Sequence, residues 1–259
     1  MITKMSERLS QYQIVEISKA KEILGENNVF GADEWKKFLG EIVQFPYIPE
    51  IPWSEDELSK PGVKQKHFLF LGLDRFDGKK VNVPTLCKYF SHKDHPKFYF
   101  PLLGEDARDP KEAYGFDDET CQLRWYFMPV GMVKNLICQY NSQPKAFNVK
   151  YEVPTVTERV TANILYYLLH KKYLDVNFQA RTSSRMPYIM YGRPLGPLTV
   201  RGEHDRGIVI SARGPYDPFL INVSASFRNL NFEKEKERSK EEETQREEKA
   251  RTDYLTRNK

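Results

Sequence analysis

Three short stretches of the sequence carry side chains suited to binding a metal ion or moving a proton. Residues 92–95 (His-Lys-Asp-His) place two imidazoles three positions apart, with an aspartate between them, and both groups are common metal ligands. Residues 74–78 (Asp-Arg-Phe-Asp-Gly) begin like a calcium-binding loop. Asp117, Asp118 and Glu119 form an acidic triplet, and carboxylates are frequent general acids and bases.

Each stretch also has a simpler structural explanation. Pro96 follows the histidines directly in a polar segment, so we expect exposed loop histidines. Residues 74–78 lack the later acidic positions and the final glutamate of a calcium loop, so we expect a tight turn after a strand. Acid–base catalysis needs two carboxylates held apart in a cleft, so we expect the acidic triplet to lie on a solvated surface or at the start of a helix.

The sequence contains none of the common catalytic motifs. A glycine-rich phosphate loop, a nucleophile elbow and an H-E-x-x-H zinc motif are all missing from it. We therefore expect a protein that is not an enzyme, with no cofactor, no catalytic residues and no metal ligands.

Basic residues interleaved with tyrosines support nucleic-acid binding as an alternative. Guanidinium groups and aromatic rings together bind single strands through phosphate contacts and base stacking. The stretch 181–213 holds most of these residues, which are Lys145, Lys150, Arg181, Arg185, Arg193, Arg201, Arg206 and Arg213, together with Tyr188 and Tyr191.

The composition indicates a globular chain with a mildly basic surface. The 259 residues are 40% hydrophobic and carry a net charge of +4, with the two signs interspersed. Cys87, Cys121 and Cys138 form no C-x-x-C pair, which is typical of a reducing compartment. The N-terminal segment lacks the apolar region of a signal peptide, and the apolar runs are too short to cross a membrane, so we expect a cytoplasmic protein with no membrane partner.

Hydrophobic periodicity predicts an α+β fold. The clearest helix lies within residues 152–174, where Thr155 and Glu158 form an S/T-x-x-E capping box. Apolar spacing predicts further helices at residues 14–24, 31–43 and 86–90. Strands are predicted at residues 67–73, 98–100, 122–132, 198–201, 207–212 and 221–227, with a hairpin turn at residues 202–206.

The chain divides into three predicted regions. Residues 1–60 form a helical region that ends in a proline-rich arm, where Phe45, Tyr47, Ile48 and Trp53 are expected to pack as the arm wraps the domain. Residues 61–230 form the α+β domain. Residues 231–259 form a charged tail, since residues 233–259 hold nine acidic and nine basic side chains, a pattern typical of a solvated helix or of disorder.

A series of short motifs in residues 120–229 is similar to a known family. They are Arg124-Trp125-Tyr126, Val153-Pro154-Thr155, Tyr166-Tyr167-Leu168, Arg181-Thr182-Ser183, Val200-Arg201-Gly202, residues 205–210 (Asp-Arg-Gly-Ile-Val-Ile) and residues 221–228 (Ile-Asn-Val-Ser-Ala-Ser-Phe-Arg). Together they resemble bacterial proteins with a C-type-lectin-like domain, including the variable proteins of diversity-generating retroelements. The resemblance implies a compact fold of short strands with packed helices.

The resemblance also implies which residues contact a ligand. Loops before the last strand would display Glu203, His204, Asp205, Arg206, Ile210, Arg213, Tyr216 and Asp217. Residues 221–227 would be the scaffold strand beneath them. The sequence therefore predicts a non-enzymatic module that binds a protein or another macromolecule, with nucleic-acid binding by residues 181–213 and a structural role in a larger assembly as alternatives.

Overall fold

The structure is a computed structural model in which most helices lie in the first half of the described chain and strands predominate after helix α8 (Val156–His170). It describes residues 15–61, 63, 66–90, 95–100, 119–131, 151–176, 179–185, 189–190, 193–194, 197–212, 221–223 and 226–227. These residues lie within one unit of the chain, Met1–Arg228.

Helices and strands both contribute to the core, so the α+β class predicted from the sequence is confirmed. The helices are α2 (Ile17–Leu24), α3 (Ala32–Leu39), α4 (Glu55–Ser59), α5 (Val83–Tyr89) and α8 (Val156–His170), with 3₁₀ turns at Glu26–Asn28 and Gly40–Ile42. The strands of the first half are β1 (Val29–Phe30), β2 (His67–Leu71), β3 (Arg75–Phe76), β4 (Lys79–Lys80), β5 (Phe98–Tyr99) and β6 (Trp125–Pro129). Those of the second half are β7 (Tyr151–Glu152), β8 (Gln179–Arg185), β9 (Ile189–Met190), β10 (Arg193–Pro194), β11 (Pro197–Glu203), β12 (Gly207–Ala212), β13 (Ile221–Val223) and β14 (Ser226–Phe227).

The sheet β1–β2–β6 is buried on both faces. β2 pairs with β6 in antiparallel register from His67↔Pro129 to Leu71↔Trp125, and β1 joins β2 in parallel. Successive side chains of a strand point to opposite faces. Phe68, Phe70, Tyr126 and Met128 therefore enter one core cluster, while Leu69, Leu71, Trp125 and Phe127 enter another.

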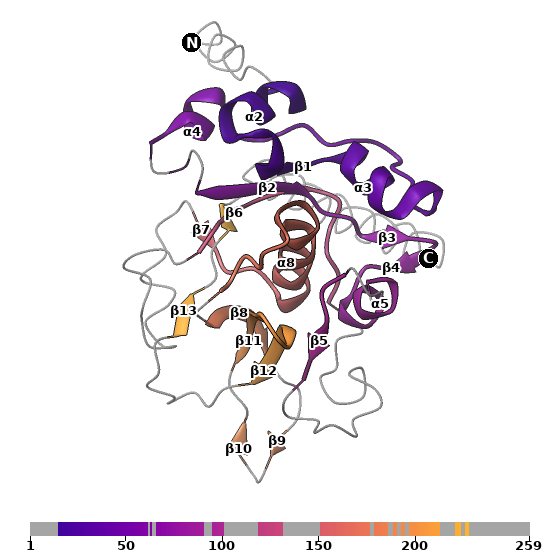
Figure 1. Cartoon of the computed structure of the whole chain (residues 1–259), viewed down its shortest axis with the longest axis vertical. Coiled ribbons are helices and arrows are strands. Elements are labelled where there is room, and N and C mark those ends of the chain that lie inside the picture. The colour runs from indigo at the N-terminus through magenta and orange to yellow at the C-terminus, as the bar shows by residue number, and fades with distance from the viewer. Residues whose placement is uncertain are drawn as a thin grey trace, which may run out of the picture. The chain divides into compact units, whose positions relative to one another are not determined.

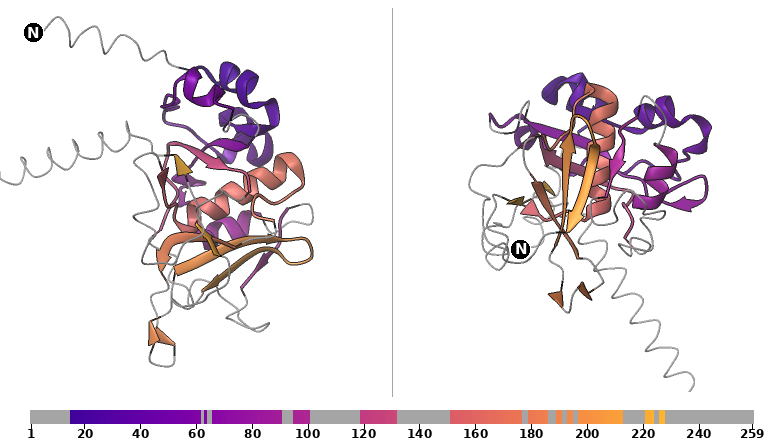
Figure 2. Two further views of the ribbon diagram at one scale, coloured as in Figure 1. Left: turned by 90° about the vertical axis from the view of Figure 1, so that its left-hand side faces the viewer. Right: turned by 60° about the horizontal axis from the view of Figure 1, so that its bottom comes forward.

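Helices α2 and α4 cover one face of this sheet, and α8 covers the other. Figure 1 shows α2 and α4 on the outer side of β2, with α8 on its inner side. Ala20 and Leu24 of α2 and Leu58 of α4 pack with the outward-facing side chains of the sheet. Figure 2 shows the same order of layers after a turn of 90°.

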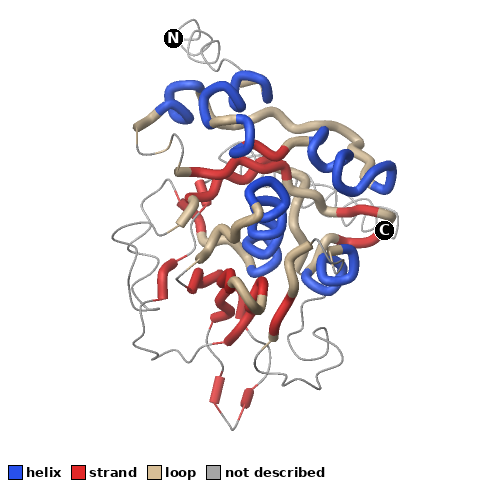
Figure 3. Tube along the Cα trace, in the orientation of Figure 1, coloured by secondary structure: helices blue, strands red, loops and turns tan. Residues whose placement is uncertain are grey.

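A second sheet, in the order β13-β8-β11-β12-β5, packs on the other side of α8. Its central pairs are antiparallel, whereas β5 pairs with β12 and β13 pairs with β8 in parallel. Figure 3 shows α8 between the two groups of strands. Leu198, Val200, Ile208 and Ile210 join Val160 and Ile164 of α8 in the core.

The capping box predicted at the start of α8 is present. Glu158 N–H donates to Thr155 Oγ1 at 3.2 Å, and Thr155 N–H donates to Glu158 Oε2 at 2.8 Å. The predicted turn at residues 74–80 is the β3–β4 hairpin, with Asp77 at φ 50° and Gly78 at φ 68°. The predicted hairpin turn at residues 202–206 connects β11 to β12.

Two expectations about local structure need correction. In the proline-rich arm Trp53 is buried, but Tyr47 and Ile48 are 61% and 49% exposed instead of packed. The predicted strand at residues 221–227 is divided between β13, which pairs with β8, and β14, which pairs with β7. The apolar pattern of residues 221–227 could not predict this change of pairing strand, because β13 and β14 are both extended.

No helix in the described part of the chain combines the length and the apolar character that a membrane span requires.

Gly72, which follows β2, packs closely against residues 121–126 and allows this contact to be tested. A Cβ at this position would lie 2.4 Å from Tyr126 Cε2, 2.5 Å from the Gln122 carbonyl oxygen and 2.9 Å from Cys121 Sγ. We expect Gly72→Ala to lower the free energy of unfolding by about 3 kcal/mol, measured by urea denaturation. Gly78→Ala is the matched control, because a Cβ there meets nothing within 4 Å, and its positive φ should cost only about 1 kcal/mol. Equal losses in the two variants would contradict this packing.

Candidate functional site

The hairpin tip, comprising Glu203, His204, Asp205 and Arg206, is the most exposed of the predicted ligand-binding segments that the structure describes. The ladder between β11 and β12 is continuous from Leu198↔Ala212 to Glu203↔Gly207. The side chains of His204 and Asp205 are fully exposed, and that of Arg206 is about half exposed. The tip therefore presents an imidazole, a carboxylate and a guanidinium from one tight turn.

Close backbone packing fixes the base of the hairpin. Gly207 has φ 85°, and a Cβ there would lie 2.2 Å from the Lys97 carbonyl oxygen. Ile208 N–H donates to the same oxygen at 2.8 Å. On the other strand, a Cβ at Gly202 would lie 2.1 Å from Tyr173 Cβ. Glycine is required at both positions because backbone or side-chain atoms occupy the space of a Cβ.

Neighbouring side chains orient Glu203 and Arg206 of the tip. Glu203 forms ion pairs with Arg201 and with Arg206, whose Nε lies 3.7 Å from Glu203 Oε2. The Arg206 guanidinium also lies over the Tyr99 ring, 5.0 Å from its centroid. Cation–π contact and ion pairing together restrict Arg206, whereas His204 and Asp205 extend into solvent.

The remaining predicted ligand-binding residues do not all join this surface. Ile210 is 0% exposed and packs in the core, because the alternation of β12 turns it toward α8. A ligand in solvent cannot contact it, so Ile210 does not belong to the site. Arg213, Tyr216 and Asp217 lie outside the described residues.

Two of the arginines considered for nucleic-acid binding are engaged within the protein. Arg181 is only 4% exposed, and Arg201 is paired with Glu203. The side chains of Arg185 and Arg193 are outside the described part of the structure. The arrangement of the described arginines therefore offers little free positive charge for phosphates.

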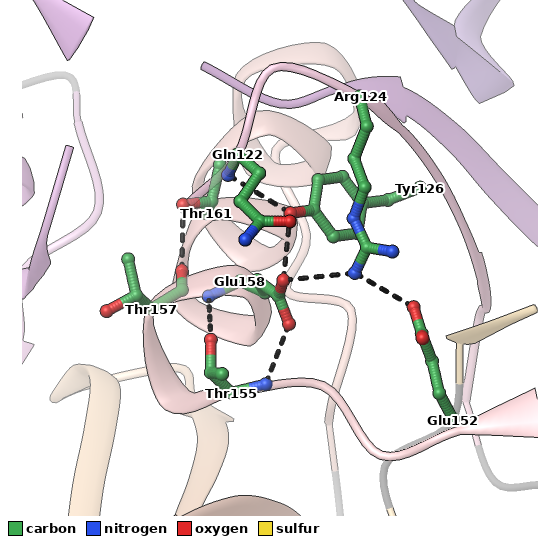
Figure 4. Close-up of polar contacts among 8 residues, drawn as sticks. All are labelled: Gln122, Arg124, Tyr126, Glu152, Thr155, Thr157, Glu158 and Thr161. Carbon is green, nitrogen blue, oxygen red and sulfur yellow. Dashed lines mark hydrogen bonds and ion pairs between the residues drawn. The ribbon is translucent and has the colours of Figure 1, made fainter. Parts of the chain in front are cut away.

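A second group of polar residues, which the sequence did not suggest as a unit, is buried beside the first turn of α8 (Figure 4). Tyr126 O–H donates to Glu158 Oε1 at 2.8 Å, and Arg124 Nη2 donates to the same oxygen at 3.3 Å. Arg124 Nη2 also lies 2.9 Å from Glu152 Oε1, and the Gln122 N–H donates to Tyr126 Oη at 3.1 Å. One guanidinium thus connects two carboxylates from different elements.

Burial and charge shift the pKa values of this polar cluster. Burial alone lowers the pKa of Arg124, but Tyr126, Glu152 and Glu158 outweigh it, so the pKa lies above its usual value. Burial raises the pKa of the Cys121 thiol to about 12, and the charge of Glu158 adds to this effect. A thiol with this pKa is protonated at neutral pH and is a poor nucleophile.

Glu119 lies next to this cluster and joins β8 to the first turn of α8. Ser184 Oγ donates to Glu119 Oε2 at 2.5 Å and accepts from Val156 N–H, in the first turn of α8, at 2.7 Å. Thr157 Oγ1 donates to the Glu119 carbonyl oxygen at 3.1 Å. Neither expectation for the acidic triplet describes Glu119, which is half-buried and begins no helix, but which contacts the first turn of α8 through Thr157. Asp117 and Asp118 lie outside the described residues.

A third polar group anchors the middle of α8. Arg159 Nε donates to Asp175 Oδ2 at 2.8 Å, and Arg159 Nη2 forms a second, shorter bond with Asp175 Oδ1. Asn163 Nδ2 donates to Asp175 Oδ2 at 2.7 Å, while Asn163 Oδ1 accepts from the Leu174 N–H at 3.1 Å. The Asp175 carbonyl oxygen in turn accepts from the Gly202 N–H at 3.1 Å. This Arg159–Asp175–Asn163 network links α8 to the base of the hairpin.

Of the histidine motif at residues 92–95, only His95 lies within the described residues. No group of three potential protein ligands for a metal ion occurs in that part of the chain. His95 is half-buried against Phe90, with ring centroids 5.4 Å apart, while residues 92–94 lie outside the description.

Sequence reasoning missed the polar cluster because its members are far apart in the chain. Arg124 and Glu158 are 34 residues apart, and Glu119 and Ser184 are 65 residues apart. The sequence did contain one indication of the cluster. Arg124 lies between apolar residues of the predicted strand 122–132, and a buried arginine requires a partner for its charge.

No protein-family model, curated protein or solved structure matches this chain.

Removing one charge of the Arg159–Asp175 ion pair should destabilise the protein strongly, and removing both charges should destabilise it less. Removing one member of a buried ion pair leaves an uncompensated charge, so Asp175→Ala should lower the free energy of unfolding by about 3 to 5 kcal/mol. Replacing both charges with apolar groups in Arg159→Met/Asp175→Leu should recover most of this loss, as measured by urea denaturation. A double variant no more stable than Asp175→Ala would contradict this explanation.

Glu119 predicts a specific dependence of stability on pH. Burial raises the pKa of its carboxyl above 4.5, and Glu158 adds to the rise, although the bond from Ser184 opposes it. The folded state therefore binds the proton more tightly than the unfolded chain. This contribution to stability is fully present below the unfolded pKa and is lost as pH rises through the folded pKa.

Glu119→Gln resembles the protonated carboxyl at every pH. The free energy of unfolding of Glu119→Gln minus that of the wild type should therefore be larger at about pH 7.5 than at about pH 4.5. Denaturant titration at both pH values measures this difference. Glu41→Gln, an exposed glutamate, is the control and should show no such trend. Parallel pH profiles for the wild type and Glu119→Gln would exclude a raised pKa at Glu119.

Proposed function

We propose that this chain is a non-enzymatic binding module that recognises a protein ligand through the hairpin tip. The observation that carries the proposal is the combination of a fully exposed turn and a fixed base. His204 and Asp205 project freely, whereas the Gly207 and Gly202 backbones are packed against Lys97 and Tyr173. Binding residues on a loop held by a rigid scaffold lose little conformational entropy when a partner docks.

The distribution of polar groups supports binding over catalysis. In the polar cluster the carboxylate of Glu158 already accepts from Tyr126, Arg124 and Thr155. Burial keeps the Cys87 and Cys121 thiols protonated, with pKa values raised to about 12. The hairpin tip combines both signs of charge with an imidazole, which suits a partner surface of mixed charge better than a uniformly anionic polymer.

Nucleic-acid binding and a structural role in a larger assembly are less well supported. Phosphate binding depends on free lysine and arginine side chains, and Arg181 is buried while Arg201 pairs with Glu203. A structural role was suggested by the tail, which lies outside the described residues, and by the proline-rich arm.

The proposal includes the C-type-lectin-like resemblance and a cytoplasmic location. The motifs that carry the resemblance fall on or next to β6, α8, β8, β11, β12, β13 and β14, and the loop that it assigns to ligand contact contains the hairpin tip. The free thiols of Cys87 and Cys121 are compatible with a reducing compartment.

Site-specific photo-crosslinking tests the proposal. A photoreactive residue replaces His204 in the full chain, which is then irradiated in an extract of its source cells, and products are identified by mass spectrometry. We expect a discrete cross-linked protein whose yield falls at least about tenfold when Asp205→Ala and Arg206→Ala are added, because central contacts dominate binding energy.

The control places the same photoreactive residue at Lys79, an exposed charged position on the β3–β4 hairpin. The product should be absent from this control. Identical products from positions 204 and 79, or an unchanged yield in the double alanine variant, would contradict binding at the hairpin tip.

A further inference from the structure

The proline-rich arm has a backbone conformation that its sequence largely fixes. Residues 46–52 read Pro-Tyr-Ile-Pro-Glu-Ile-Pro, so two overlapping P-x-x-P motifs share Pro49. Each proline has φ near −65°, and the residue before a proline is held in the extended or polyproline II region. Only Tyr47 and Glu50 are free of both restrictions, so the sequence favours polyproline II for the residues that follow the backbone bend at Pro46.

Contacts at both ends attach the arm to the body of the protein. Val43 is buried before it and Trp53 is buried after it. Ile51 forms a β-bridge with Val15, and Trp125 Nε1–H donates to the Pro49 carbonyl oxygen at 2.7 Å. The arm is therefore a fixed segment whose central part spans two anchored ends.

Apolar side chains of this segment face solvent. Four large hydrophobic residues are exposed in the described part of the chain, and three of them, Ile42, Tyr47 and Ile48, lie on or just before the arm. Pro46 and Glu50 are exposed beside them. Exposed apolar groups that gather in one segment commonly mark an interaction site.

We propose that residues 46–50 are a docking site for a domain with an aromatic-lined groove that recognises polyproline II. The prolines remove backbone N–H donors at three positions, which disfavours pairing with a partner strand. The spacing of three residues instead presents Pro46 and Pro49 along one edge of a polyproline II helix, with Tyr47 beside them. This surface is separate from the hairpin tip and does not depend on the function proposed for it.

Attachment at both ends should raise affinity. A free proline-rich peptide must lose conformational freedom when it binds, whereas the arm is already restrained by Trp125 and by the Val15–Ile51 bridge. A groove of this kind should therefore bind the intact chain more tightly than a peptide of residues 44–53.

The test measures binding of the intact chain to an array of purified SH3 and WW domains by biolayer interferometry. We expect at least one domain to bind the wild type and to lose about tenfold or more in affinity for Tyr47→Ala/Ile48→Ala and for Pro46→Ala. Lys79→Ala/Lys80→Ala, on the exposed strand β4, should bind like the wild type. Thermal denaturation checks that the variants fold, which we expect because Tyr47, Ile48 and Pro46 are exposed.

Three results would overturn the proposal. The first is that no domain of the array binds the wild type. The second is that Tyr47→Ala/Ile48→Ala binds as well as the wild type. The third is that sedimentation shows self-association of the wild type that this double variant abolishes, since the exposed segment would then be a contact between two copies of the chain.

Discussion

Two consecutive residues of α8 carry opposite charges into the protein interior, and the arrangement of the described core depends on the pairing of both. Glu158 meets Arg124 of the chain leading into β6, and Arg159 meets Asp175 in the segment after α8. An unpaired charge in either position would cost several kcal/mol. Both charges are satisfied only when Glu158 faces Arg124 and Arg159 faces Asp175, so the ion pairs and the apolar residues of α8 together specify the rotation of the helix about its axis.

The consequence for function is that both proposed binding surfaces lie at the edge of a firmly packed interior. The Asp175 carbonyl holds the Gly202 N–H at the base of the hairpin, so the network around Arg159 extends to the strand that carries the tip. On the opposite side of the β1–β2–β6 sheet, the indole of Trp125 holds the proline-rich arm. In each case a buried polar contact positions a segment whose outer side chains are free to meet a partner.

Local features of the fold were predictable from sequence, whereas pairings between distant segments were not. The capping box of Thr155 and Glu158 is determined by residues three positions apart, and the β3–β4 turn by Asp77 and Gly78. The sequence also predicted a strand at residues 122–132, which contains β6, but not that both faces of β6 are buried. Contacts between distant segments depend on how the chain folds back, as in the parallel pairing of β5 with β12 and the hydrogen bond between Glu119 and Ser184. Ile210 was wrongly assigned to the ligand-binding surface because the resemblance did not specify which face of β12 points into the core.

Hydrogen–deuterium exchange of the full chain tests most directly whether a rigid interior supports an exposed tip. Amides of α8 from Arg159 to Leu168 should exchange only through global unfolding, and the amide of Ile208, bonded to Lys97, should also be strongly protected. The amides of Asp205 and Arg206 should exchange within the shortest labelling time. Exchange of α8 through a local opening, at a lower free energy than that of the β11–β12 ladder, would contradict the account.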